Sequence, residues 1–182
     1  MKSRKDFEES AIACGIIAHY ATCLADTLAS ELGILSKSDP FFIVQPWKKV
    51  PPGTNGGVTL GGFFWSAFGG MLMGAGTLVM DMFSGIQVSA FDTLCFASAC
   101  GLFESLLDSL LGATLQATYY DPDKKLIHCC SDKIVSNNRM VDHLYGWNVL
   151  SNAQVNLVSV FITTLIGGFY LGPLMMSSNR SL

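Results

Sequence analysis

Four long hydrophobic stretches dominate the chain, and polar segments separate them. The stretches cover about residues 11–35, 58–80, 86–117 and 150–176. A helix needs roughly 20 consecutive apolar residues to cross the hydrocarbon core of a bilayer, and each stretch meets that length. The pattern therefore predicts an all-α fold, a polytopic transmembrane helical bundle of about four spans, in which residues 1–182 form a single membrane domain.

The two longer polar segments, residues 36–57 and 118–149, are expected to be loops. Four prolines in the first of them exclude a continuous helix. Its Trp47 favours the depth of the lipid headgroups, where Trp is enriched. The two loops hold seven of the eleven Lys and Arg residues, which favours placing both in the cytosol. In that orientation Asn179, within the sequon Asn-Arg-Ser, faces the opposite side.

The composition also indicates a membrane protein. Half of the residues are hydrophobic and 14% are charged, whereas a soluble domain has about 25% charged residues. We therefore expect an integral, multi-pass membrane protein, with an endomembrane favoured, and no nucleic-acid partner. Four of the six cysteines lie inside the hydrophobic stretches. Cys129 and Cys130, next to His128, could bind a metal, but reduced loop cysteines are the favoured interpretation.

Small residues recur at four-residue steps in the second stretch, at Gly62, Ser66, Gly70 and Gly74. Such spacing lets helix backbones approach closely, so this stretch is expected to be packing core, and it also allows helix-mediated oligomerisation. The third stretch exceeds the length of a minimal span. It is expected to tilt, to protrude or to break near Gly101.

None of the four stretches contains a Lys or Arg, yet two of them carry acidic residues. These are Asp26 and Glu31 in the first stretch, and Asp92, Glu104 and Asp108 in the third. A carboxylate at bilayer depth costs several kcal/mol unless something neutralises it. A proton, a water-filled cavity or a metal ion are the candidates, and hydrogen-bonded acids that hold helices together are the structural alternative. We favour metal or proton chemistry.

A glycine-rich turn precedes the second stretch, in the segment Val-Pro-Pro-Gly-Thr-Asn-Gly-Gly-Val-Thr at residues 50–59. Glycines expose backbone N–H groups, and the positive end of a helix dipole adds to their attraction for an anion. The turn therefore favours a bound phosphate, with Thr54, Asn55, Gly56 and Gly57 as the cradle.

Four motifs resemble those of the transmembrane protein 19 family. They are Ala-Asp-Thr-Leu-Ala-Ser-Glu-Leu-Gly at 25–33, the turn at 50–59, Leu-Asp-Ser-Leu-Leu-Gly-Ala-Thr-Leu-Gln at 107–116 and Asn-Ala-Gln-Val-Asn at 152–156. This family includes the plant phytyl-phosphate kinase, and its motifs are distantly similar to those of the CTP-dependent phytol and dolichol kinases. Its members usually have further membrane helices before the first motif, so we expect this chain to lack them.

The resemblance implies transfer of a phosphoryl group from a nucleoside triphosphate to a prenyl alcohol or prenyl phosphate, with Mg²⁺. On that hypothesis Asp26, Glu31 and Asp108 hold the metal, and Glu104 or Asp108 orients an acceptor that arrives laterally from the bilayer. Carboxylate-bound metal and backbone donors suffice for phosphoryl transfer, which depends mainly on positioning and charge stabilisation.

Two other classes of function remain open. In an ion- or proton-coupled transporter the same acids would relay protons, and in a non-catalytic membrane scaffold they would hold helices together. The phosphate-like glycine turn favours the enzyme over the transporter, since a proton relay does not need such a turn.

Overall fold

The computed structural model describes residues 4–33, 35–36, 38–84, 89–122, 126–128 and 142–171. Several sequence predictions concern residues outside these ranges. They are the start of the third stretch at 86–88, the end of the fourth at 172–176, the Cys129–Cys130 pair, all four Lys and Arg residues of the second loop, and the sequon at Asn179.

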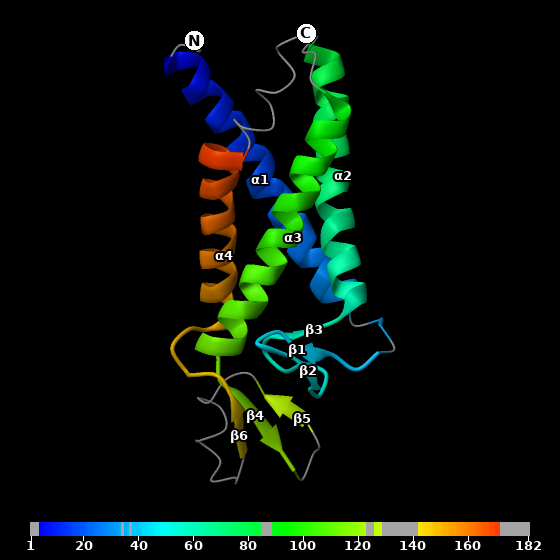
Figure 1. Ribbon diagram of the computed structural model, residues 1–182, viewed down its shortest axis with the longest axis vertical. Coiled ribbons are helices and arrows are strands. Elements are labelled where there is room, and N and C mark those ends of the chain that lie inside the picture. Colours follow the sequence, from blue (N-terminus) through cyan, green and yellow to red (C-terminus); the bar gives the residue numbers. More distant parts are fainter. Residues whose placement is uncertain are drawn as a thin grey trace.

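Four helices form a bundle (Figure 1). They are α1 (Arg4–Gly33), α2 (Leu60–Ser84), α3 (Ala90–Leu115) and α4 (Asn152–Ile166), the last continued by one π-helical turn, η2 (Gly167–Leu171). Within the described residues, all four elements are long and apolar enough to cross a membrane. The predicted all-α membrane bundle is therefore confirmed.

α1 and α3 differ from what was predicted for the first and third hydrophobic stretches. α1 begins at Arg4 rather than near residue 11, because charged residues with good helix propensity extend the helix beyond its apolar part. α3 runs unbroken from Ala90 to Leu115, so it does not break at Gly101; it crosses α1 at an angle (Figure 1).

The interior of the bundle consists mostly of small side chains, with Phe96 and Val155 as large buried exceptions, while many large apolar side chains face outward. Cys14, Ala18, Ala25 and Cys100 are fully buried, whereas Met82 is 81% exposed. Lipid tails solvate large apolar groups as well as a protein core does, so helices in membranes associate through close contact of small residues. This exposure pattern fits a bundle surrounded by lipid.

Close helix contact occurs where the small-residue stripe of α2 predicted it. Ser66, Gly70 and Gly74 are buried. A Cβ atom added to Gly74 would lie 3.0 Å from the Cβ of Ala97 on α3. The prediction that this helix is packing core is confirmed.

The two polar segments contain short strands that the sequence analysis did not predict. In the first, β1 (Phe41–Phe42), β2 (Gln45–Lys49) and β3 (Gly57–Val58) form an antiparallel sheet in the order β2-β1-β3. In the second, β4 (Thr118–Asp121), β5 (Leu126–His128) and β6 (Asp142–Tyr145) form another in the order β5-β4-β6. Both sheets lie at the same end of the bundle (Figure 1).

A small apolar cluster ties the sheets to the end of α3. Phe42, Val50 and Ala113 are its buried members, and Tyr145 of β6 packs against them. The rings of Phe42 and Tyr145 lie 4.6 Å apart, and the Nζ of Lys48 lies 4.7 Å from the centre of the Tyr145 ring. The two sheets therefore pack against each other and against the end of α3, so the two polar segments are not independent loops.

Candidate functional site

A cavity of about 300 Å³ lies at the sheet end of the bundle, where α1 ends and α2 begins. α1, α3, the start of α2 and the segment that carries the first sheet all contribute to its wall. Hydroxyl groups are prominent in it: the described lining residues include Ser30, Ser36, Ser38, Thr59, Ser105 and Ser109. No Lys, Arg or His is among the described residues of the wall.

Two of the predicted acids, Asp26 of α1 and Asp108 of α3, meet in this cavity. The Nδ2 atom of Asn156 donates a hydrogen bond to the Oδ2 atom of Asp26 over 3.1 Å. The Oδ1 atom of Asp108 is buried and has no hydrogen-bond partner among the described residues. A buried polar atom without a partner is rare and points to a water or an ion at that place.

Glu104 lies outside the cavity wall, one helical turn before Asp108 on α3. Its side chain is fully buried, and its Oε1 atom accepts a hydrogen bond of 2.7 Å from the Oγ atom of Ser159 on α4. The Oε2 atom has no partner among the described residues. Glu104 therefore lies next to the site without lining it, and the prediction that it orients an acceptor stays a prediction.

The third predicted metal ligand, Glu31, is not in the cavity wall. It is exposed near the end of α1. The described residues contain no group of three or more His, Cys, Asp and Glu side chains that could hold a metal ion. Of the predicted ligands, the structure brings together Asp26 and Asp108 only.

Asp92, the remaining acid of the third stretch, lies far from the cavity along α3. It occupies the first turn of the helix, and its backbone N–H donates to the Oγ atom of Ser89, which caps the helix. A negative charge at a helix N-terminus is stabilised by the helix dipole. This acid has a structural explanation that needs no ligand.

The glycine turn contributes Gly53 and Gly57 to the cavity wall. Thr54 and Asn55, which were predicted to bind a phosphate, instead make hydrogen bonds that hold the turn in place. The Oγ1 atom of Thr54 donates to the carbonyl of Pro51 over 2.7 Å. The backbone N–H of Asn55 donates to the Oγ1 atom of Thr118 over 3.2 Å.

The backbone of the turn is also occupied by its own contacts. The N–H of Gly57 donates to the carbonyl of Thr54 over 2.9 Å, so it is not free for a phosphate in this conformation. Gly56 has a φ of +75°, and a Cβ atom there would lie 2.7 Å from the Cα of Ala113. Glycine is required at that position by backbone conformation and by the contact with α3.

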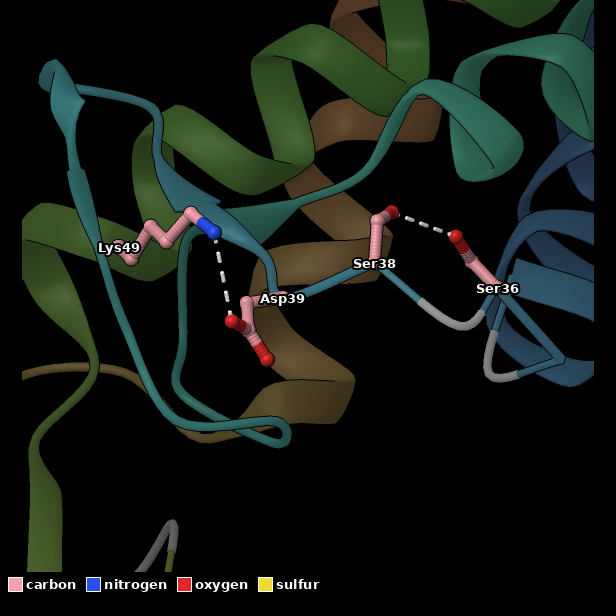
Figure 2. Close-up of polar contacts among 4 residues, drawn as sticks. All are labelled: Ser36, Ser38, Asp39 and Lys49. Atoms are coloured by element: carbon pink, nitrogen blue, oxygen red, sulfur yellow. Dashed lines mark hydrogen bonds and ion pairs between the residues drawn. The ribbon is translucent and has the colours of Figure 1, made fainter.

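Between α1 and β1, the described residues Ser36, Ser38 and Pro40 line the cavity. The Oγ atoms of Ser36 and Ser38, both in the cavity wall, lie 2.8 Å apart (Figure 2). Beside them, the Nζ atom of Lys49 lies 3.4 Å from the Oδ2 atom of Asp39. The side chains of this ion pair are 75% and 65% exposed, so it contributes little to stability.

The contacts that α4 makes with the acidic residues were not predicted from the sequence. Asn156 and Ser159 reach across the bundle to Asp26 and Glu104. The four-residue spacing of Asn152 and Asn156 signalled a polar helix face, but spacing within one helix cannot tell which helix that face meets.

The family described as "Integral membrane protein DUF92" matches residues 1–164. Protein PGR of Arabidopsis thaliana is 34% identical over 165 residues, which cover 86% of this chain and 54% of that protein. An uncharacterized membrane protein of Methanocaldococcus jannaschii is 34% identical over 153 residues, 84% of this chain and 49% of that protein.

A third relative, an uncharacterized membrane protein of Synechocystis, is 33% identical over 107 residues, 58% of this chain and 38% of that protein. The chain thus spans about half the length of these relatives, or less. No solved structure matches the chain.

Proposed function

We propose that this chain, which belongs to the DUF92 family of integral membrane proteins, binds a metal-bound phosphate group in its cavity and takes part in phosphoryl transfer to a lipid-borne acceptor. The acceptor class is a prenyl alcohol or a prenyl phosphate, and the donor is a nucleoside triphosphate. The observation that carries the proposal is the hydroxyl-lined cavity in which Asp26 and Asp108 meet without a basic partner among the described residues.

The carboxylates suit Mg²⁺. This ion usually keeps several waters and is held by one or two carboxylates together with phosphate oxygens, rather than by a complete cage of protein ligands. Asp26 and Asp108 would hold it, and the unpartnered Oδ1 atom of Asp108 is a ready ligand. When bound, the metal supplies neutralisation of the negative charge that develops during phosphoryl transfer.

The hydroxyl groups of the wall suit the phosphate. Thr59 is informative because its Oγ1 atom accepts a hydrogen bond from the N–H of Gly62 over 3.0 Å, which leaves its own hydroxyl proton free to donate. Donors of this kind replace the backbone cradle predicted at Thr54 to Gly57, whose N–H groups are largely engaged in the turn.

The location of the cavity supports a lipid-borne acceptor. It lies where α1 ends, where α2 begins and where the first sheet starts, which would be the depth of the lipid headgroups in a bilayer that these helices span. A polar head group attached to a prenyl chain would reach this depth while its chain stayed in the bilayer.

The test is a transfer assay with the protein in lipid nanodiscs, labelled nucleoside triphosphates and a panel of prenyl alcohols and prenyl phosphates. We expect label in the lipid fraction, and we expect Asp108→Asn to abolish it. Glu31→Gln is the matched control, since it neutralises an exposed carboxylate outside the cavity and should leave transfer intact. Absence of transfer across the panel, or full transfer by Asp108→Asn, would refute the proposal.

A second candidate is a proton-coupled carrier, and one observation favours it. The side chains of Glu104 and Thr163 are buried, and the Oε2 atom of Glu104 and the Oγ1 atom of Thr163 have no partner among the described residues. A carrier would need Glu104 for proton flux into liposomes, and Glu104→Gln would stop that flux. Phosphoryl transfer without such flux would favour the enzyme.

A further inference from the structure

The described cavity wall supplies too few protein ligands to fill the coordination sphere of a divalent cation. Asp26 and Asp108 come from different helices, and one oxygen of Asp26 already accepts a hydrogen bond from Asn156. No third His, Cys, Asp or Glu among the described residues completes a cluster with them. Mg²⁺ requires six oxygen ligands in near-octahedral geometry, so most of them must come from water or from another bound molecule.

The described cavity wall also lacks positively charged side chains that would neutralise a phosphate. The described wall has hydroxyl donors but no Lys, Arg or His side chain. A phosphate alone would face two carboxyl groups, which repel it when they are ionised, and they would do so more strongly across a partly buried space than in water. Among the wall residues that the structure describes, none carries a positive charge that would offset this repulsion for an anion arriving without a cation.

We propose that the cavity binds a divalent cation and a phosphate group as a mutually dependent pair, each of them weakly in the absence of the other. This inference rests on the proposed function, because it takes a metal-bound phosphate as the ligand. The cation removes the repulsion between the phosphate and the carboxylates, and the phosphate supplies oxygen ligands that the protein lacks. The coupling is reciprocal by thermodynamic necessity: each partner raises the affinity of the other by the same factor.

The test uses Mn²⁺, which is detectable by electron paramagnetic resonance, and tripolyphosphate as probes. Binding of each probe to the protein in nanodiscs is measured alone and in the presence of the other, with the Mn²⁺–tripolyphosphate complex in solution included in the fit. We expect each probe to raise the affinity of the other at least about tenfold, and by an equal factor.

A double variant makes the test specific. Asp26→Asn together with Asp108→Asn keeps the shape of the wall and removes its charge. In this variant tripolyphosphate alone should bind at least as well as it binds to the parent, while the effect of Mn²⁺ on that binding should vanish. Glu31→Gln is the control and should retain the full coupling.

Two results would overturn the inference. If tripolyphosphate binds the parent equally well with and without Mn²⁺, the coupling is wrong while the phosphate site and the proposed function stand. If the two probes bind neither singly nor together, both the coupling and the proposed function fail.

Discussion

Replacing Gly69 on α2 with alanine tests whether close backbone contact between α1 and α2 stabilises the bundle. A Cβ atom at this position would lie 2.8 Å from the Cα of Ala25 and 3.0 Å from the carbonyl oxygen of Leu24, both on α1. These neighbours are backbone atoms, so no flexible side chain can turn away. In Gly69→Ala, one helix must therefore shift by at least about half an ångström to restore an ordinary carbon–carbon contact.

The expected cost follows from measured overpacking. Forcing an extra methyl group into a well-packed interior costs about 1–3 kcal/mol. Gly76 is the matched control, because it lies two turns further along α2 and has nothing within 4 Å of its added Cβ. Replacing glycine with alanine improves helix propensity by about 1 kcal/mol at either position, so comparing the two variants cancels that gain.

Thermal unfolding in detergent micelles, followed by circular dichroism, measures the difference. Gly69→Ala should unfold at a lower temperature than the parent, and Gly76→Ala at the same or a higher temperature. If the two variants unfold together, close backbone contact between α1 and α2 does not determine stability, and the explanation of the small-residue interior is wrong.

Two other variants test residues near the cavity. Thr118→Val keeps the shape of a fully buried side chain but removes the acceptor of the Asn55 N–H. The loss should lower the free energy of unfolding by about 1–3 kcal/mol and accelerate hydrogen exchange at the Asn55 amide, and an unchanged exchange rate would contradict the proposed role of this hydrogen bond. Glu104→Gln keeps an oxygen that can accept from Ser159 and removes a buried carboxylate, so the unfolding midpoint in detergent should be unchanged or raised. A fall of several degrees would show that the negative charge of Glu104 is needed for the fold.

The four spans were predictable because a bilayer imposes a simple physical demand. Every backbone polar group in lipid must be satisfied within the helix, and about 20 apolar residues must cover the thickness of the membrane. The strands were not predictable in the same way. Pairs such as Phe41–Val58 and Thr118–Tyr145 join residues distant in sequence through elements of two to five residues, too short for an alternating pattern to be recognised.

Part of the candidate site was predictable from the distribution of charged residues along the sequence. Acids without bases in a membrane segment must meet something polar, and this reasoning led to Asp26 and Asp108, which the structure brings to one cavity. It also led to Glu31, which is exposed, because a rule about charge does not tell which side of a helix faces the bundle. Thr54 and Asn55 hold the turn through their side chains. The partner of Asn55, the carbonyl of Ala117, is 62 positions away in the chain, so its role was not predictable from local sequence.

The hydrogen bond between Asp26 and Asn156 also constrains the biogenesis of the protein. Its two residues are 130 positions apart in the chain. A ribosome adds roughly 5–20 residues per second, so the carboxylate on α1 is made on the order of ten seconds before the amide that binds it. During this interval the Asp26 carboxylate lacks its native partner on α4. A nascent chain that stops before α4 is completed never acquires that hydrogen bond.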